Sequence, residues 1–288
     1  MWLIKFLKSN VLYLLWFVIY FTIAWWIFGA TLQAFIIVAA IYGISMSVAL
    51  SPVGEIILIM VENCREPVTE RERKYLIPIF EEAYQNAKEF NKSLNNGIKI
   101  YIMDAMYVNA FAIGRKTVAV TRGALSTFTA EELKGIIAHE LGHMTYGHTK
   151  ALLLTMIGNV LFSAIAFVLR LILYICEIVA NITARMNIIG IVFMAMTFVA
   201  RIVSEFCIFF TVTSGQFLLA LNSRINEQQA DKFAYDIGLG KQLISGLYTI
   251  QKISIHKKLK LSEMFTASHP HIADRIAWLE RLENGRYT

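Results

Sequence analysis

Two histidines and a glutamate in the middle of the chain have the spacing of a hydrolytic metal site. The segment reads His139-Glu140-Leu141-Gly142-His143. On an α-helix, residues four apart lie about 40° from each other around the axis, so both imidazoles can face one metal ion. Glu140 lies between them, where it can take a proton from a water that the metal activates. Neutral imidazoles suit zinc, and a hydrolytic zinc keeps three protein ligands and one open position. The pattern therefore predicts a zinc hydrolase with Glu140 as general base.

The competing explanation is a chance match in an amphipathic helix. The chain has six histidines, and a chance HExxH is then expected in roughly one such sequence in a hundred. The apolar residues around the motif weaken that explanation further.

A third metal ligand is needed, and two downstream positions compete for it. His148 follows closely, but it lies about 180° round from His139 if the helix continues, so we expect it to point away. We therefore expect His148 to lie at the end of the helix or to contact a metal ligand without binding the metal itself. Glu227 and Asp231 share one helix face in the segment 227–231. Glu227 can complete a His₂Glu site, and Asp231 can accept the N–H of a ligand histidine. The predicted metal ligands are therefore His139, His143 and Glu227.

A helix must present the motif, and its first residues carry a start signal. Thr129 and Glu132 have the spacing of a capping box, in which each side chain bonds the other's backbone N–H. We expect the helix to run from about Ala130 towards Lys150. Its apolar side consists of Leu133, Ile136, Ile137 and Leu141.

The residues before this helix predict a small β-sheet. Ile98–Met103 alternates with period two, and Lys116–Thr121 is a second strand candidate with Arg122-Gly123 as a turn. Between them, Val108–Ala112 is short and apolar, which predicts an edge strand. The part of the chain that carries the motif is thus predicted to be mainly helical with a small sheet.

The composition excludes a soluble enzyme. Hydrophobic residues make up 57% of the 288 residues and charged residues only 17%, against about 45–50% and about 25% in ordinary soluble domains. Ser9–Pro52 and Ala151–Leu169 contain no charged residue. A helix that is apolar on every side must be buried on every side. Aromatic residues at 12% exclude a disordered chain, and three scattered cysteines give no disulfide scaffold. The chain is therefore predicted to be an integral membrane protein in contact with the lipid bilayer.

Four stretches are apolar over about the 20 residues that a spanning helix needs. They form two predicted hairpins: Val11–Gly29 with Leu32–Leu50, and Leu152–Ala180 with Ile188–Leu221. Basic residues flank the first hairpin, whereas its turn is uncharged and the second turn carries only Arg185. By the positive-inside rule, both termini and the polar parts lie in the cytoplasm. The net charge of +6 is then a bias near the membrane, and we expect no nucleic-acid partner.

The predicted fold class is an α+β membrane protein in which two transmembrane hairpins carry a mainly helical cytoplasmic domain with a small β-sheet and the zinc motif. The predicted division is 1–54 for the first hairpin, 55–150 for the first part of the cytoplasmic domain, 151–221 for the second hairpin and 222–288 for the second part of the cytoplasmic domain.

Four charged residues interrupt the second hairpin: Arg170, Glu177, Arg201 and Glu205. Arg201 and Glu205 are four apart and can pair on one helix, or Arg170 can reach Glu205 across the helices. Because unpaired charges in a membrane are costly, structural pairing is favoured over the alternative, a polar cavity that admits water or substrate.

Together these residues resemble the HtpX family of membrane zinc metalloproteases, which is related to the CAAX prenyl-protein proteases. Beyond the paired N-terminal spans and the HExxH helix, the resemblance rests on Glu70–Arg73, Asn109–Ala112, Ser223-Arg224 leading to 227–231, Leu261–Phe265, and the stretch from His269-Pro270 to Arg275. It implies that the cytoplasmic domain is a zincin-like metalloprotease domain and that His139, His143 and Glu227 hold one zinc ion per chain. It also implies that Glu140 is the general base and that substrate lies along the edge strand of Asn109, Ala110, Phe111 and Ala112.

The resemblance further implies that His269 and Arg275 approach the reaction centre, where they are candidates to stabilise negative charge on the carbonyl oxygen. One departure is the link between the last two spans, which is shorter than in some members. The expected role is cleavage of cytoplasmic loops or tails of damaged membrane proteins at the bacterial inner membrane. The part in quality control and stress response follows from the resemblance alone.

Three other functions compete with this one. A prenyl-protein protease needs a lipid-enclosed chamber, and four spans are few to enclose one. A non-catalytic zinc scaffold would want four protein ligands, whereas three are found. Transport through the bundle rests only on the four intramembrane charges, with no internal repeat to support it.

Overall fold

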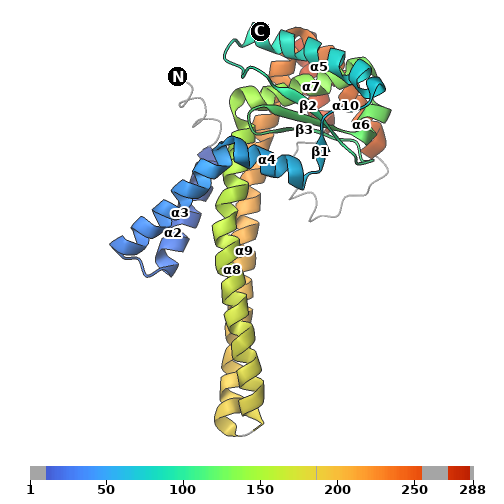
Figure 1. Ribbon diagram of the computed structural model, residues 1–288. Helices are drawn as coiled ribbons and strands as arrows, with labels where there is room; N and C mark the ends of the chain where they lie inside the picture. The colour runs from blue at the N-terminus through green and yellow to red at the C-terminus, as the bar shows by residue number, and fades with distance from the viewer. Residues whose placement is uncertain (1–10, 186, 255–271, 286–288) are drawn as a thin grey trace.

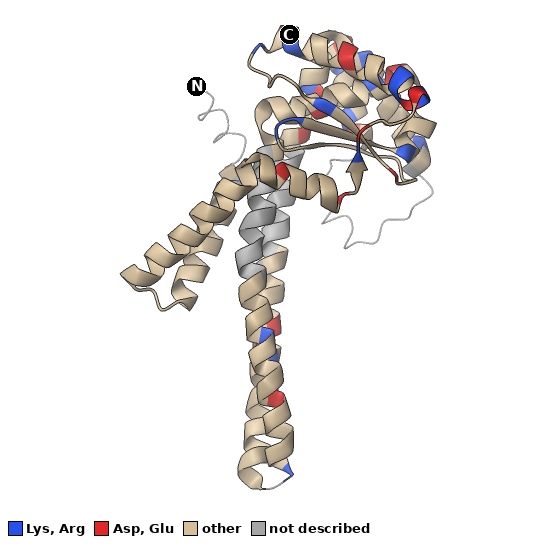
Figure 2. Cartoon of the chain, in the orientation of Figure 1, with Lys and Arg blue, Asp and Glu red and all other residues tan. Residues whose placement is uncertain are grey.

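The structure is a computed structural model that describes residues 11–185, 187–254 and 272–285. A unit of helices around a small sheet stands at one end of a long helical rod, and a shorter helical hairpin lies beside the rod (Figure 1). The rod consists of α8 (His148–Ala184) and α9 (Ile188–Ala234), and the hairpin consists of α2 (Val11–Ile27) and α3 (Leu32–Leu50). The charged residues gather on the unit, whereas the rod and the hairpin carry few of them (Figure 2).

Three of the described helical segments are long and apolar enough to cross a membrane: Leu32–Leu50, Ala164–Ala184 and Ile188–Phe210. The remaining predicted span, Val11–Gly29, coincides with α2, whose apolar part, Leu14–Ile27, is shorter than a spanning helix requires. The chain turns between α2 and α3 at Gly29 and Ala30, which both have positive φ. The aromatic side chains of the two helices then meet, as in the edge-on contact of Phe17 with Tyr42.

The charges of the rod pair across its two helices. Arg170 on α8 donates two hydrogen bonds of 2.7 Å to Glu205 on α9, and Arg201 on α9 reaches Glu177 on α8 at 3.0 Å. Of the two predicted pairings for Glu205, the structure has the one between helices rather than the one within α9. A guanidinium and a carboxylate on facing helices can meet fork to fork, which satisfies both groups in a largely apolar setting.

The sheet has the strand order β1-β2-β4-β3. The strands are β1 (Cys64–Arg65), β2 (Lys99–Met103), β3 (Ala110–Ile113) and β4 (Thr117–Thr121). β2 and β4 run parallel, and β3 pairs antiparallel with β4 at one edge. The predicted edge strand is therefore confirmed; it begins two residues later and ends one residue later than predicted, so Asn109 lies just before it.

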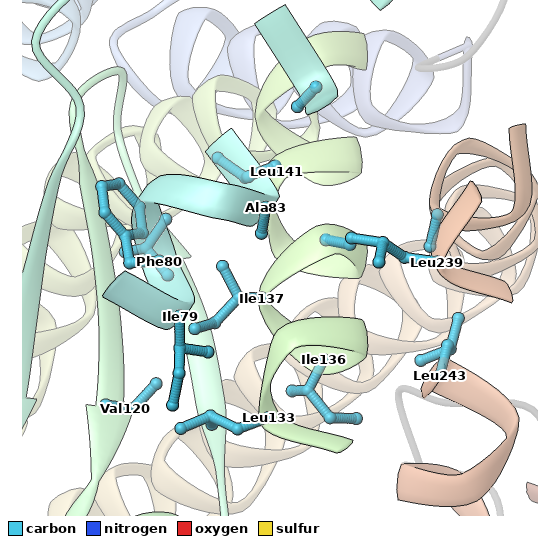
Figure 3. Close-up of a cluster of buried hydrophobic side chains, with 14 of the residues drawn as sticks. Ile79, Phe80, Ala83, Val120, Leu133, Ile136, Ile137, Leu141, Leu239 and Leu243 are labelled. Carbon is cyan, nitrogen blue, oxygen red and sulfur yellow. The ribbon is translucent and has the colours of Figure 1, made fainter. Parts of the chain in front are cut away.

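The core of the unit is built around α7 (Ala130–Tyr146), the helix that carries the HExxH segment. Its Leu133, Ile137 and Leu141 are fully buried, and they face α5 (Glu70–Phe90) and the sheet, whereas Ile136 faces α10 (Gly240–Ser254) (Figure 3). Burying each such side chain stabilises the fold by about 1.5–3 kcal/mol. The predicted apolar side of the helix is therefore the side that packs, and it fixes the orientation of the motif.

The start of α7 is as predicted, whereas its end and the segment before it differ from the prediction. The capping box of Thr129 and Glu132 is present. Arg122 and Gly123, predicted as a turn, instead begin the short helix α6 (Arg122–Thr127), because the Thr121 side chain caps its first turn. The predicted helix towards Lys150 ends early, at Tyr146, because Gly147 takes a left-handed conformation with φ 78°.

The remaining elements connect these parts. α4 (Pro52–Val61) follows α3 after one residue and lies beneath the sheet beside the start of the rod (Figure 1). α9 leads through a π-helical turn, η1 (Tyr235–Leu239), into α10, against which α12 (Ile272–Glu283) packs. α7 and α9, the helices of the predicted ligands, are therefore continuous or nearly continuous with the rod.

Candidate active site

Three side chains from α7 and α9 converge on one point. The Nε2 atoms of His139 and His143 are 3.1 Å apart. Glu227 on α9 places one carboxylate oxygen 3.4 Å from His139 Nε2 and the other 3.3 Å from His143 Nε2. His139 and Glu227 are buried, and His143 is nearly so. The structure thus brings together the three predicted ligands, with donor atoms within 4.8 Å of one another.

A glycine in the HExxH segment allows α9 to come close enough. A Cβ atom at Gly142 would lie 2.9 Å from the Cα of Ala230, so a larger residue would push α9 away. Ala230 lies three residues after Glu227 and is fully buried. The small pair Gly142–Ala230 therefore sets the distance between α7 and α9, the helices that carry the predicted ligands.

Asp231 holds His139 from the side opposite to the cluster. One turn after Glu227, it accepts a 2.8 Å hydrogen bond from His139 Nδ1, and it is fully buried. When the ring is neutral with its proton on Nδ1, the Nε2 lone pair of His139 points towards Glu227 and can bind a metal. This is the predicted position of Asp231, and carboxylates behind ligand histidines commonly fix the ring in this way.

Arg275 on α12 bridges the two buried carboxylates. Its guanidinium donates to both oxygens of Asp231, at 2.8 and 2.6 Å, and its third nitrogen lies 2.9 Å from Glu227. The side chain is 9% exposed. Arg275 therefore stands directly beside the ligands, and its contact with a reacting carbonyl remains a prediction.

The pocket favours positive charge at the position of the ligands. Burial and the Arg275 guanidinium lower the pKa of His139, but Glu227 and Asp231 outweigh them and raise it to about 10. Burial raises the pKa of Asp231, but Arg275 and His139 lower it below its usual value. Two imidazole nitrogens and a carboxylate in a negative pocket are the donor set of a His₂Glu zinc site, so the residues fit a zinc ion.

His148 lies against the site, which corrects the expectation that it points away. Gly147 ends α7, so His148 does not continue that helix but turns back to place its Nδ1 2.9 Å from His143 Nδ1. Its Nε2 lies 3.1 Å from the side-chain oxygen of Gln229. Burial, together with the nearby His143, lowers the pKa of His148 to about 3, so the ring is neutral.

These contacts assign the protons. If His143 Nε2 binds the metal, its Nδ1 carries the proton and donates to His148 Nδ1. His148 must then carry its own proton on Nε2, which faces the amide oxygen of Gln229. A neutral imidazole therefore supports His143 where a carboxylate supports His139.

Replacing His148 by Phe is expected to weaken zinc binding about 10- to 100-fold, because His143 loses the acceptor that fixes its ring. Competition with a fluorescent chelator measures the affinity. Tyr146→Phe is the matched control, because it keeps the ring that stacks on His148 and removes only a hydroxyl. Equal affinities of the His148 variant and the control would show that His148 does not orient His143.

Glu140 and the edge strand β3 are the remaining predicted parts of the site. Glu140 follows His139 on α7 and is only 9% exposed, so its side chain is largely shielded from solvent. β3 packs against α7. Thr121 donates to the carbonyl of Asn109, so by the alternation of an antiparallel ladder Ala110 and Ala112 direct their N–H and C=O groups to the free edge. Phe111 lies between them on the same strand.

His269 lies outside the described residues. The contacts of Gln229, and the close approach at Gly142, were not predicted from the sequence. Gln229 lies in the 227–231 segment, but His148 reaches it only because the chain turns at Gly147. Glycine often ends a helix, so Gly147 is the sequence signal that could have predicted this turn.

Comparison with known proteins gives a family and several relatives. Residues 70–283 match peptidase family M48. The chain is 26% identical to Protease HtpX of Alcanivorax borkumensis, with 89% of this chain and 88% of that one covered. It is 25% identical to a Protease HtpX homolog of Methylacidiphilum infernorum, with coverage of 88% and 86%. Among solved structures, S. mikatae Ste24p is similar with 19% identity and a TM-score of 0.45, over 96% of this chain and 64% of that one.

Proposed function

The chain belongs to peptidase family M48, and from this premise we propose that it is a zinc-dependent endopeptidase that cleaves cytoplasmic segments of membrane proteins. The predicted resemblance to HtpX proteases is confirmed, and the chain is a metalloendopeptidase with apolar helices long enough to cross a membrane. Zinc as the metal, the roles of the individual residues and the substrate class are the proposed parts.

One observation supports the zinc site above all others, the buried convergence of His139, His143 and Glu227. Each ligand has a partner behind it: Asp231 behind His139, His148 behind His143, and Arg275 beside Glu227. Such partners hold ligand atoms in place before the metal arrives. The chemistry that zinc supplies when bound is a water of pKa about 7 and a polarised carbonyl.

In this site Glu140 is the group that moves a proton. It takes the proton from the attacking water and delivers it to the nitrogen of the leaving amine, so that it returns to its starting state. Its 9% exposure limits exchange of that proton with bulk water. Arg275, and His269 if it reaches the site, would stabilise the negative charge that develops on the carbonyl oxygen.

Substrate would bind as an extra strand along β3. The outward backbone groups of Ala110 and Ala112 can bond a peptide in extended form, and such bonds accept many side-chain sequences. Packing of β3 against α7 brings this edge to the helix of the HExxH motif. A protease with this binding mode needs an unfolded substrate segment, which agrees with a role in removing damaged proteins.

The membrane arrangement is proposed as two hairpins with both termini and the active site in the cytoplasm, in the bacterial inner membrane. Chain segments 55–150 and 222–288 would form one protease domain interrupted by the second hairpin. His148 begins α8 directly after α7, and Glu227 lies on α9 itself. Because three residues rise only about 4.5 Å along a helix, Glu227 lies close to the end of the uncharged stretch before Arg224. The site would therefore sit near the cytoplasmic surface.

This arrangement predicts a preference for substrates held at the membrane. One flexible peptide can be tethered to a membrane anchor by a short linker, or supplied free in solution, to chain reconstituted in vesicles. We expect at least about tenfold faster cleavage of the tethered peptide, because tethering raises its effective concentration at the site. Glu140→Gln gives the background rate. Equal rates for the two peptides would contradict the proposed substrate class without touching the peptidase activity.

A further inference from the structure

The short helix α4 presents its apolar side outward. Val53, Ile56, Ile57, Met60 and Val61 are 45–69% exposed. These positions follow the spacing i, i+3, i+4, i+7, i+8, so they form one continuous stripe along the helix. Glu55 is the single charged residue of α4, and it lies on the opposite side. A surface helix of a soluble domain turns its apolar side towards the core and its charged residues towards water. In α4 the apolar side faces outward and the charged residue faces inward.

Glu55 points inward and holds the turn between β3 and β4. Its carboxylate accepts from the backbone N–H groups of Arg115 and Lys116, at 3.1 and 3.0 Å, and from the Thr117 hydroxyl at 2.6 Å. Thr149, in the first turn of α8, donates a 2.6 Å bond to the carbonyl of Gly114 in the same turn. Two elements next to candidate spans therefore hold the end of the edge strand.

The connection to α3 fixes where α4 can lie. Only Ser51 separates α4 from α3, and α3 is itself a candidate span. A Cβ atom at Gly54 would lie 2.5 Å from the carbonyl oxygen of Ala49, so the two helices meet at a tight corner. The outward stripe of α4 therefore begins where the candidate span α3 ends.

We propose that α4 lies in the lipid headgroup layer, with its outward stripe in the acyl chains, and that Glu55 couples this membrane-bound helix to the edge strand β3. A helix with such a stripe buries it about 5–10 Å below the headgroup boundary. Left in water, five aliphatic side chains would each lose the favourable free energy of burial. The strand would then keep a fixed height above the bilayer, and its use for substrate rests on the proposed function.

Lipid quenching tests the position of α4 without any measurement of activity. A fluorophore is attached to Ile57→Cys in a chain whose three native cysteines, Cys64, Cys176 and Cys207, are replaced by serine. Ile77→Cys on α5 is the matched control, because the exposed fraction of Ile77 is similar, at 40% against 45% for Ile57, and α5 lies on the far side of the unit from the rod (Figure 1). The full chain is reconstituted in phosphatidylcholine vesicles with brominated acyl chains.

We expect a large loss of emission at position 57 and none at position 77. A label at 57 that the brominated lipid does not quench, whether it faces water or a second copy of the chain, overturns the proposal. Failure of peptide cleavage would leave this result unaffected, so the two proposals fail separately.

Hydrogen exchange tests the coupling. In Glu55→Ala, the amides of Arg115 and Lys116 lose their acceptor, and we expect faster deuterium uptake in the peptide that covers them. Glu66→Ala is the control, because Glu66 pairs with Lys99 on the same sheet and makes no bond to this turn. Equal uptake in the two variants would show that Glu55 does not hold the edge strand.

Discussion

Replacing Glu140 by Gln is expected to lower peptide cleavage by at least about 10²-fold and to leave zinc binding intact. The amide has the shape of the carboxylate but cannot take a proton from water. General acid–base catalysis contributes about 10²–10⁴-fold, so we expect a loss of at least this size. Glu140 is not among the three converging donors, so the zinc content should stay at the wild-type value. Cleavage of an unfolded peptide, with zinc measured on the same sample, checks both parts.

The contrasting variant is Glu227→Gln, which changes a proposed ligand and should lose zinc and cleavage together. The pair separates a proton carrier from a ligand. Unchanged cleavage by Glu140→Gln would remove the assignment of the general base and, with it, the proposed mechanism.

The second large effect is expected for Arg275→Met. This change leaves Asp231 and Glu227, at 0% and 2% exposure, without the guanidinium that lies between them. Breaking a buried ion pair by removal of one partner costs about 3–5 kcal/mol. We therefore expect a large drop in the unfolding temperature of the zinc-depleted protein, measured in nanodiscs. Zinc should recover part of the loss, because its charge offsets the same carboxylates.

Arg122→Met is the control for charge removal as such. Arg122 pairs with Asp104 near the surface, with both side chains about half exposed, and pairs of this kind contribute about 0–1 kcal/mol. Similar unfolding temperatures for the two variants would mean that Arg275 is not the counter-charge of the site.

The sequence was sufficient where one short pattern determines a local structure. The Thr129–Glu132 spacing determines the start of α7, and the apolar side of α7 determines its orientation in the core. Once α7 is oriented, the spacing of His139 and His143 places both rings on one side. Glu227 was predicted from chemistry, because a His₂ site needs a third ligand, and the structure places its carboxylate at that point.

Contacts between distant segments could not be predicted in this way. His148 was expected to point away because a helix was assumed to continue through Gly147, and the positive φ of that one residue reverses the direction. The sequence allows Glu205 to pair with either Arg201 or Arg170, and only the packing of α8 on α9 selects Arg170. Glu55 bonds to a turn about sixty residues away, and no spacing in the sequence reports such a contact.

The central claim is that His139, His143 and Glu227 hold a catalytic zinc ion, and X-ray absorption at the zinc edge of the purified chain tests it most directly. We expect one zinc per chain, with nitrogen and oxygen neighbours at about 2.0–2.2 Å and the outer-shell pattern of imidazole. In Glu227→Gln the zinc content should fall. Sulfur neighbours at about 2.3 Å, or full zinc content in the Glu227 variant, would contradict the claim.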